Sequence, residues 1–100
     1  MQQELRDCDP QRWRDLADLL TRRRIELSSR YVNRAVFARE KTLNYRLVYD
    51  IERHRRQDYG RAIIILIERC YSLPDGFIRQ FLTGQTDSLP AGDDATAEAA

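Results

Sequence analysis

Apolar residues recur at three- and four-residue steps along most of this chain, which is the period of an amphipathic helix. The first such stretch covers residues 10–27, where Asp9 and Pro10 suit a helix cap followed by the first helical position. A break over residues 28–32 ends it. The inward positions expected for this helix are Trp13, Leu16, Leu19, Leu20 and Ile25.

Two short helices are predicted next, over residues 33–41 and 44–53, with a turn at Thr42 and Leu43 between them. Asn33 and Asn44 suit the caps of these helices. The apolar positions are spaced as in two crossed, packed helices: Phe37, Ala38, Leu43, Val48 and Ile51. The same spacing leaves a set of polar and aromatic side chains pointing outward: Asn44, Tyr45, Arg46, Tyr49 and Arg53.

Two more helices follow an arginine-rich loop at residues 54–59. The fourth begins at Gly60 and Arg61 and is stopped by Leu73 and Pro74, because proline cannot continue a helix. Its expected inward residues are Ile63, Leu66, Ile67, Cys70 and Tyr71. Asp75 is expected to cap a short fifth helix, and Gly84 suits its end. The apolar residues of that helix are Phe77, Ile78, Phe81 and Leu82.

The pattern therefore predicts an all-α protein with one folded unit. Its expected organisation is a flexible N-terminus at residues 1–9, a five-helix domain at 10–84 and a disordered acidic tail at 85–100. The longest apolar run, residues 62–67, is too short to cross a bilayer, and the N-terminus lacks a secretory signal. We expect a cytoplasmic protein whose Cys8 and Cys70 are reduced thiols; a disulfide between them is the alternative.

The net charge of +1 conceals an uneven distribution of charge. Residues 22–61 hold twelve basic and five acidic residues, whereas residues 83–100 hold four acids and no base. Sixteen of the 17 basic residues are arginine, which forks onto phosphates and guanine edges better than lysine does. Candidates for phosphate contacts are Arg34, Arg53, Arg55, Arg56 and Arg61, and Arg39 is a weaker candidate because Glu40 follows it. A merely solvated basic face is the alternative.

The helix at 44–53 has a composition that suits the major groove of DNA. Arg46 can fork onto guanine, and Tyr45 and Tyr49 can pack on thymine methyl groups or bind phosphates. Asn44 can bond an adenine edge, although helix capping is the preferred interpretation. Asp50 is expected to pair with Arg46 or Arg53 and so to restrain the reading face.

Several segments together resemble the Cro/CI-type (XRE) helix-turn-helix family of phage repressors. The resemblance covers about residues 16–82. It rests on Phe37-Ala38, Thr42, Leu43, Asn44, Val48 and Glu52, on Ile67, Cys70, Tyr71 and Leu73, and on Arg24 to Leu27. It implies a five-helix repressor-like domain and an ion pair between Arg24 and Glu52. The chain departs from the family at three positions: Thr42 and His54 replace glycines, and Arg34 replaces a glutamine.

The function predicted is sequence-specific DNA binding by a transcriptional regulator, a phage, prophage or bacterial repressor. The resemblance implies a homodimer on double-stranded DNA. Its seam would include Ile64 or Ile65 with residues 77–82, or else Trp13 and Leu16. The alternative function is an antitoxin-like module that binds a partner protein and binds DNA secondarily. We expect no enzyme, metal or cofactor, because metal-ligand spacing and a phosphate-cradling glycine loop are both lacking.

Overall fold

The computed structural model describes residues 4–89, and within that range the chain is entirely helical. In chain order the elements are the 3₁₀ turn η1 (Leu5–Asp7), α1 (Pro10–Leu27), the 3₁₀ turn η2 (Ser29–Val32), α2 (Arg34–Glu40), α3 (Tyr45–Glu52), α4 (Arg61–Cys70) and α5 (Phe77–Leu82). The predicted all-α class and the order of five helices are confirmed. Most of the expected acidic tail, residues 90–100, lies outside the described residues.

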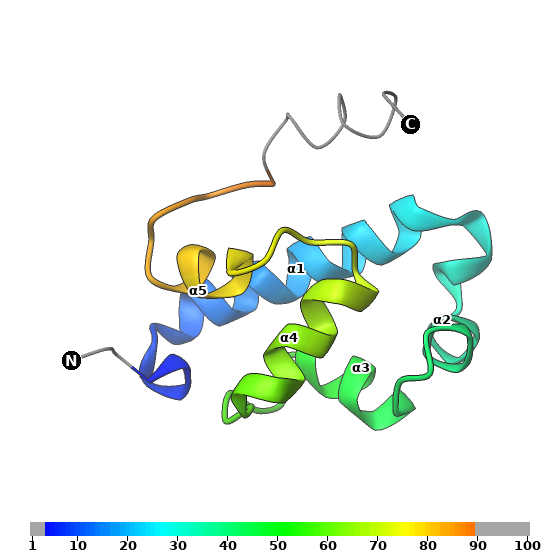
Figure 1. The fold of residues 1–100 in the computed structure, drawn as a ribbon, viewed down its shortest axis with the longest axis horizontal. Coiled ribbons are helices and arrows are strands. Elements are labelled where there is room, and N and C mark those ends of the chain that lie inside the picture. Colours follow the sequence, from blue (N-terminus) through cyan, green and yellow to red (C-terminus); the bar gives the residue numbers. More distant parts are fainter. Residues whose placement is uncertain (1–3, 90–100) are drawn as a thin grey trace.

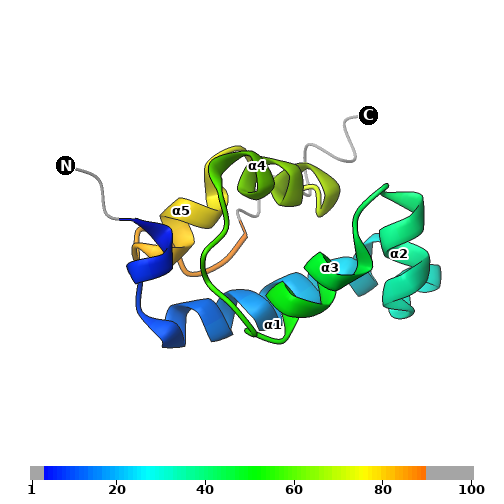
Figure 2. The same ribbon diagram turned by 90° about the horizontal axis from the view of Figure 1, so that it is seen from below.

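Helix α1 runs along the long dimension of the molecule (Figure 1), α3 and α5 pack against it, α2 packs against α3, and α4 packs against α5. Helix α5 lies near the N-terminal end of α1, and α2 lies beyond its C-terminal end. Seen from below, α3 lies in front of α1, and the loop that leaves α3 leads to the start of α4 (Figure 2). No helix among residues 4–89 has both the length and the apolar character needed to span a membrane.

Three of the four predicted N-terminal caps are confirmed. The side chains of Asp9, Asn33 and Asn44 accept hydrogen bonds from the first backbone amides of α1, α2 and α3. The prediction for Asp75 is wrong, since α5 begins after Gly76 and the Asp75 side chain does not cap it. The carboxylate of Glu68, on α4, instead accepts hydrogen bonds from the amides of Gly76 and Ile78 at 3.2 and 3.0 Å.

This role of Glu68 decides which side of α4 faces inward. Glu68 is 3% exposed and shares its face with Ile64, Ile67 and Tyr71, which are buried. Leu66 was predicted to point inward but is 37% exposed, because it lies on the side opposite Glu68. Of the two candidates for an exposed seam residue, Ile64 is buried and Ile65 is exposed.

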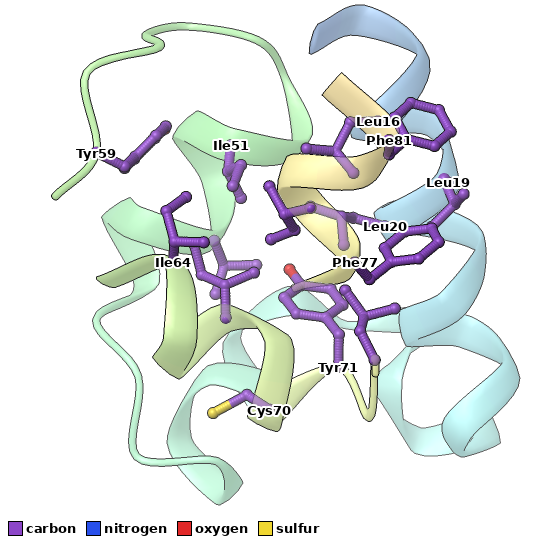
Figure 3. Close-up of a cluster of buried hydrophobic side chains, with 14 of the residues drawn as sticks. Leu16, Leu19, Leu20, Ile51, Tyr59, Ile64, Cys70, Tyr71, Phe77 and Phe81 are labelled. Atoms are coloured by element: carbon purple, nitrogen blue, oxygen red, sulfur yellow. The ribbon is translucent and has the colours of Figure 1, made fainter. Parts of the chain in front are cut away.

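The core gathers apolar side chains from all five helices. Figure 3 labels core residues of α1, α3, α4 and α5. Trp13 and Leu16 are fully buried, so they cannot form the alternative dimer seam, and the apolar residues of α5 are buried as well. Ile25 was predicted to point inward but is exposed. Its neighbour Arg24 takes the inward position, because consecutive residues of a helix point about 100° apart.

Residues 4–9 differ from the expectation of a flexible N-terminus. Leu5 packs against the core, and its carbonyl accepts a hydrogen bond from Trp13 Nε1 at 2.9 Å. Cys8 is 2% exposed. Cys8 and Cys70 are both free and buried, as expected for thiols that behave as small apolar residues.

Helices α2, α3, α4 and α5 are each followed by a residue in the left-handed backbone conformation. Thr42, His54, Ser72 and Gly84 have φ values of 57°, 52°, 56° and 84°. In each case the next amide bonds back to a carbonyl five residues earlier, as in a Schellman motif. Only Gly84 was predicted from its residue type. Thr42 and His54 therefore adopt the backbone conformation that suits glycine, although neither is one.

We predict that Thr42→Gly stabilises the protein by about 0.5–1 kcal/mol. The left-handed conformation costs a side-chain-bearing residue about 1–2 kcal/mol, and the added flexibility of glycine in the unfolded state offsets part of the gain. Thr83→Gly is the matched control, because Thr83 ends α5 with φ −91° and gains no such relief. Chemical denaturation measures both. A loss of stability in Thr42→Gly as large as in Thr83→Gly would contradict this account.

Candidate nucleic-acid interface

Helix α3 presents the predicted outward residues on one side and core residues on the other. Asn44 is exposed, and its Oδ1 accepts the Arg46 amide at 2.7 Å, so the side chain acts as a cap. Tyr45 is 48% exposed, Arg46 and Arg53 are exposed, and Tyr49 is half-buried. The opposite side buries Val48, Ile51 and Glu52. The sequence therefore predicted this face correctly.

The two tyrosines and two arginines of this region form a cluster. The rings of Tyr45 and Tyr49 stack with centroids 6.2 Å apart. The guanidinium carbon of Arg53 lies 5.6 Å from the Tyr49 ring centroid, and that of Arg34, from α2, lies 5.9 Å from it. Tyr49 thus links a cation on α2 to the exposed face of α3. Cation–π contacts of this kind are worth about 0.5–1 kcal/mol at exposed sites.

Arg46 is held by its own helix. Its Nε lies 3.5 Å from Asp50 Oδ1, one helical turn away, while its side chain stays 78% exposed. Of the two partners considered for Asp50, the structure has Arg46. An exposed pair of this spacing contributes little to stability, about 0.3–0.5 kcal/mol. Its effect is to restrict the orientations of a guanidinium that remains open to solvent.

The loop after α3 carries further exposed arginines. Arg55 and Arg61 are exposed, the second at the first position of α4. The Nε of Arg56 lies 3.0 Å from Asp58 Oδ1, and its guanidinium covers the Tyr59 ring at 4.6 Å. Hydrogen bonds from Arg56 lower the pKa of the Asp58 carboxyl. The loop is tied to the N-terminal segment by Gln57, whose amide donates to the carbonyls of Arg6 and Cys8.

Beneath this surface, Glu52 ends α3 inside the protein. The predicted ion pair is confirmed: Arg24 Nε and Nη2 donate to the Glu52 carboxylate at 2.8–3.1 Å, and both side chains are almost fully buried. The carboxylate also accepts from Tyr71 Oη at 2.6 Å, from Arg34 Nε at 2.9 Å and from Thr21 Oγ1 at 3.2 Å. We call Glu52 and these four donors the Glu52 cluster.

The charge of Glu52 survives its burial. Burial is the largest influence on its pKa and raises it, but hydrogen bonds from Arg24, Tyr71 and Arg34 outweigh burial and hold the pKa below its usual value. Burial and the neighbouring Glu52 charge raise the pKa of Tyr71. Glu52 therefore stays ionised and Tyr71 stays protonated at neutral pH. An ionised acceptor with four donors fixes the C-terminal end of α3 relative to α1, α2 and α4.

Other arginines hold the fold together and are thereby removed from the basic surface. Arg12 donates to the carbonyls of Phe81 and Thr86 at the end of α5. Arg23 donates to the carbonyls of Tyr71 and Ser72 at the end of α4, at 3.0 and 2.8 Å. The sequence did not predict these roles, or the polar role of Tyr71, because the partners lie 19 to 74 residues apart in the chain.

Of the nine predicted contact residues, Asn44 caps α3, and the other eight lie on α2, on α3 or between α3 and the start of α4. Comparisons with protein-family models, with curated proteins and with solved structures found no match for this chain.

We predict that Glu52→Ala lowers the free energy of unfolding by about 3 kcal/mol. The substitution leaves the buried Arg24 charge and the Tyr71 hydroxyl without their acceptor. For a domain of this size, that loss lowers the midpoint of thermal unfolding by roughly 10–20 °C. Glu26→Ala is the matched control, because the Glu26 side chain is exposed and its ion pair with Arg23 is long, at 4.0 Å. Equal midpoints for the two variants would refute the structural role of Glu52.

Acid should weaken the fold through the same carboxylate. Because folding lowers the Glu52 pKa, its contribution to stability is present above the unfolded-state value, about 4.3, and is lost as pH falls through the folded-state value. Denaturant unfolding of the wild type between pH 5 and pH 2 should show this decline. In Glu52→Gln, which has no group to protonate here, the decline should be smaller; an identical decline would exclude Glu52 as its source.

Proposed function

We propose that this chain is a sequence-specific DNA-binding transcriptional regulator. In this proposal α2, the turn at residues 41–44 and α3 form a Cro/CI-type helix-turn-helix that places α3 in the major groove. The observation that carries the proposal is the two-sided character of α3. Its outer face offers tyrosine rings and guanidinium groups to solvent, while its inner face is held by the Glu52 cluster.

The backbone at two positions supports the family resemblance. The Cro/CI pattern has glycines where this chain has Thr42 and His54, and both residues have positive φ values here. A fold in which those positions require a left-handed backbone explains why glycine suits them in other chains. The two substitutions therefore do not argue against a helix-turn-helix.

The proposed contacts divide into reading and anchoring residues. Arg46 forks onto a guanine edge, and Tyr45 and Tyr49 pack on thymine methyl groups. Asn44 keeps its role as a cap. Phosphate contacts come from the arginines that border α3: Arg34, Arg53, Arg55, Arg56 and Arg61. A rim of phosphate contacts around a reading helix sets its register on the duplex.

We further propose that two copies bind one operator, in the cytoplasm of a bacterial host. A single recognition helix reads one short half-site, and a homodimer doubles the sequence that is read. Selecting bound duplexes from random DNA tests the main proposal. Enrichment of a motif with two related half-sites is expected. Recovery of no motif at low salt would overturn sequence-specific binding and favour the antitoxin-like alternative.

We predict different losses for Arg46→Ala and Arg55→Ala. Arg46→Ala should bind the selected duplex tenfold or more weakly while its binding to a scrambled duplex changes little, because a forked base contact is worth about 1–3 kcal/mol of discrimination. Arg55→Ala should weaken binding to both duplexes alike. Mobility-shift titrations at one salt concentration measure both, and each variant is the control for the other. Equal losses on both duplexes for Arg46→Ala would contradict its reading role.

A further inference from the structure

Arg34 is attached to the protein interior by one end of its guanidinium group. Its Nε–H donates to Glu52 Oε1 at 2.9 Å, and its side chain is 24% exposed while that of Glu52 is completely buried. The group also lies near the Tyr49 ring. Within residues 4–89, no hydrogen bond involves its terminal Nη1 and Nη2 groups. A guanidinium held at Nε keeps this outer pair of NH₂ groups available for a forked contact.

The acceptor of this hydrogen bond, Glu52, is itself held from several sides. Arg24 approaches the Glu52 carboxylate from α1 with two nitrogens, and Tyr71 approaches it from the end of α4. Arg24 is in turn held by the carbonyls of Tyr31 and Val32. An acceptor fixed from several sides determines where the Arg34 guanidinium lies. Little side-chain entropy then remains to be lost when that group meets a ligand.

We propose that Arg34 is a preset clamp for one DNA backbone phosphate and that Glu52 is its positioning residue. This inference rests on the proposed function. In it the buried carboxylate keeps Arg34 Nε–H, and the outer NH₂ groups form two bonds to a phosphate beside α3. The same side chain therefore joins the interior of the protein to the nucleic acid. Glu52 acts on binding through Arg34, without a contact of its own to DNA.

Lysine cannot replace arginine in this arrangement. A guanidinium presents donors at two separate edges, so it can bond a carboxylate and a phosphate at once. An ammonium is a single point charge, and the buried Glu52 carboxylate would draw it away from the phosphate. Arg55 offers the contrast, since it is exposed and forms no ion pair within the described residues. Lysine should serve there almost as well.

The test compares Arg34→Lys and Arg34→Gln with Arg55→Lys and Arg55→Gln on a duplex selected by the wild type. Affinity is measured from 50 to 200 mM salt. Arg34→Lys should bind roughly tenfold more weakly than the wild type. Its plot of log K against log salt should be less steep, with a slope smaller in magnitude by about 0.9, and Arg34→Gln should show the same change. Arg55→Lys should keep the wild-type slope, whereas Arg55→Gln should lose about 0.9.

The possible outcomes separate the inference from the function on which it rests. Wild-type affinity and slope in Arg34→Lys would overturn the clamp and leave the DNA-binding proposal intact. Wild-type protein that selects no duplex would overturn the proposed function itself. Thermal unfolding of each variant shows whether it is folded at the assay temperature.

A second measurement uses the wild-type protein alone and needs no folded variant. In NMR spectra, the Arg34 Nε–H signal should exchange slowly with solvent in both free and DNA-bound protein. Its terminal NH₂ signals should become slow only when DNA is added. Loss of Nε–H protection on adding DNA would mean that Arg34 leaves Glu52 to bind, and it would overturn the clamp.

Discussion

The buried charge of Glu52 determines how the rest of this protein can be arranged. A carboxylate taken out of water is costly unless donors surround it, and the chain supplies them from α1, from α2 and from the end of α4. The hydrogen bonds to Glu52 hold the end of α3 against α1 through Arg24. They also place the Tyr71 hydroxyl in the interior and direct the Arg34 side chain from α2 toward α3. The outer face of α3 owes its position to these hydrogen bonds and to the burial of Val48 and Ile51 on the inner face of the same helix.

Local signals in the sequence predicted the helices well. Asp9 with Pro10, and the asparagines at 33 and 44, act on amides two or three residues away, so their roles can be seen in the sequence. Long-range contacts could not be predicted in this way. Glu68 caps a different helix, and this role turned α4 so that Leu66 faces outward. Asp75 stands where a capping residue is expected from the local sequence, but its side chain does not cap α5.

In the candidate site, too, some features could be predicted from the sequence and others depend on long-range contacts. The exposed face of α3 followed from helical periodicity, and the Arg24–Glu52 pair followed from family resemblance. The connection of Arg34 to Glu52 followed from neither, because the resemblance has glutamine at that position and the two residues are 18 apart. Arginine clustering in the sequence also overstated the basic surface. Within residues 22–61, Arg23 donates to the backbone carbonyls of Tyr71 and Ser72 instead of facing solvent as a free cation.

The hydrogen bonds of Gln57 affect how the loop that carries Arg55 and Arg56 is held. Its side-chain amide holds the loop through the backbone carbonyls of Arg6 and Cys8, so the identity of the side chain at position 6 is irrelevant to that hold. The conformation of the segment at 5–8 is what counts. Detachment of residues 5–8 from the core would remove the acceptors of Gln57. The loop that carries Arg55 and Arg56 would then lose this anchor. The N-terminal end of the folded unit is thus linked to the arginine-bearing loop.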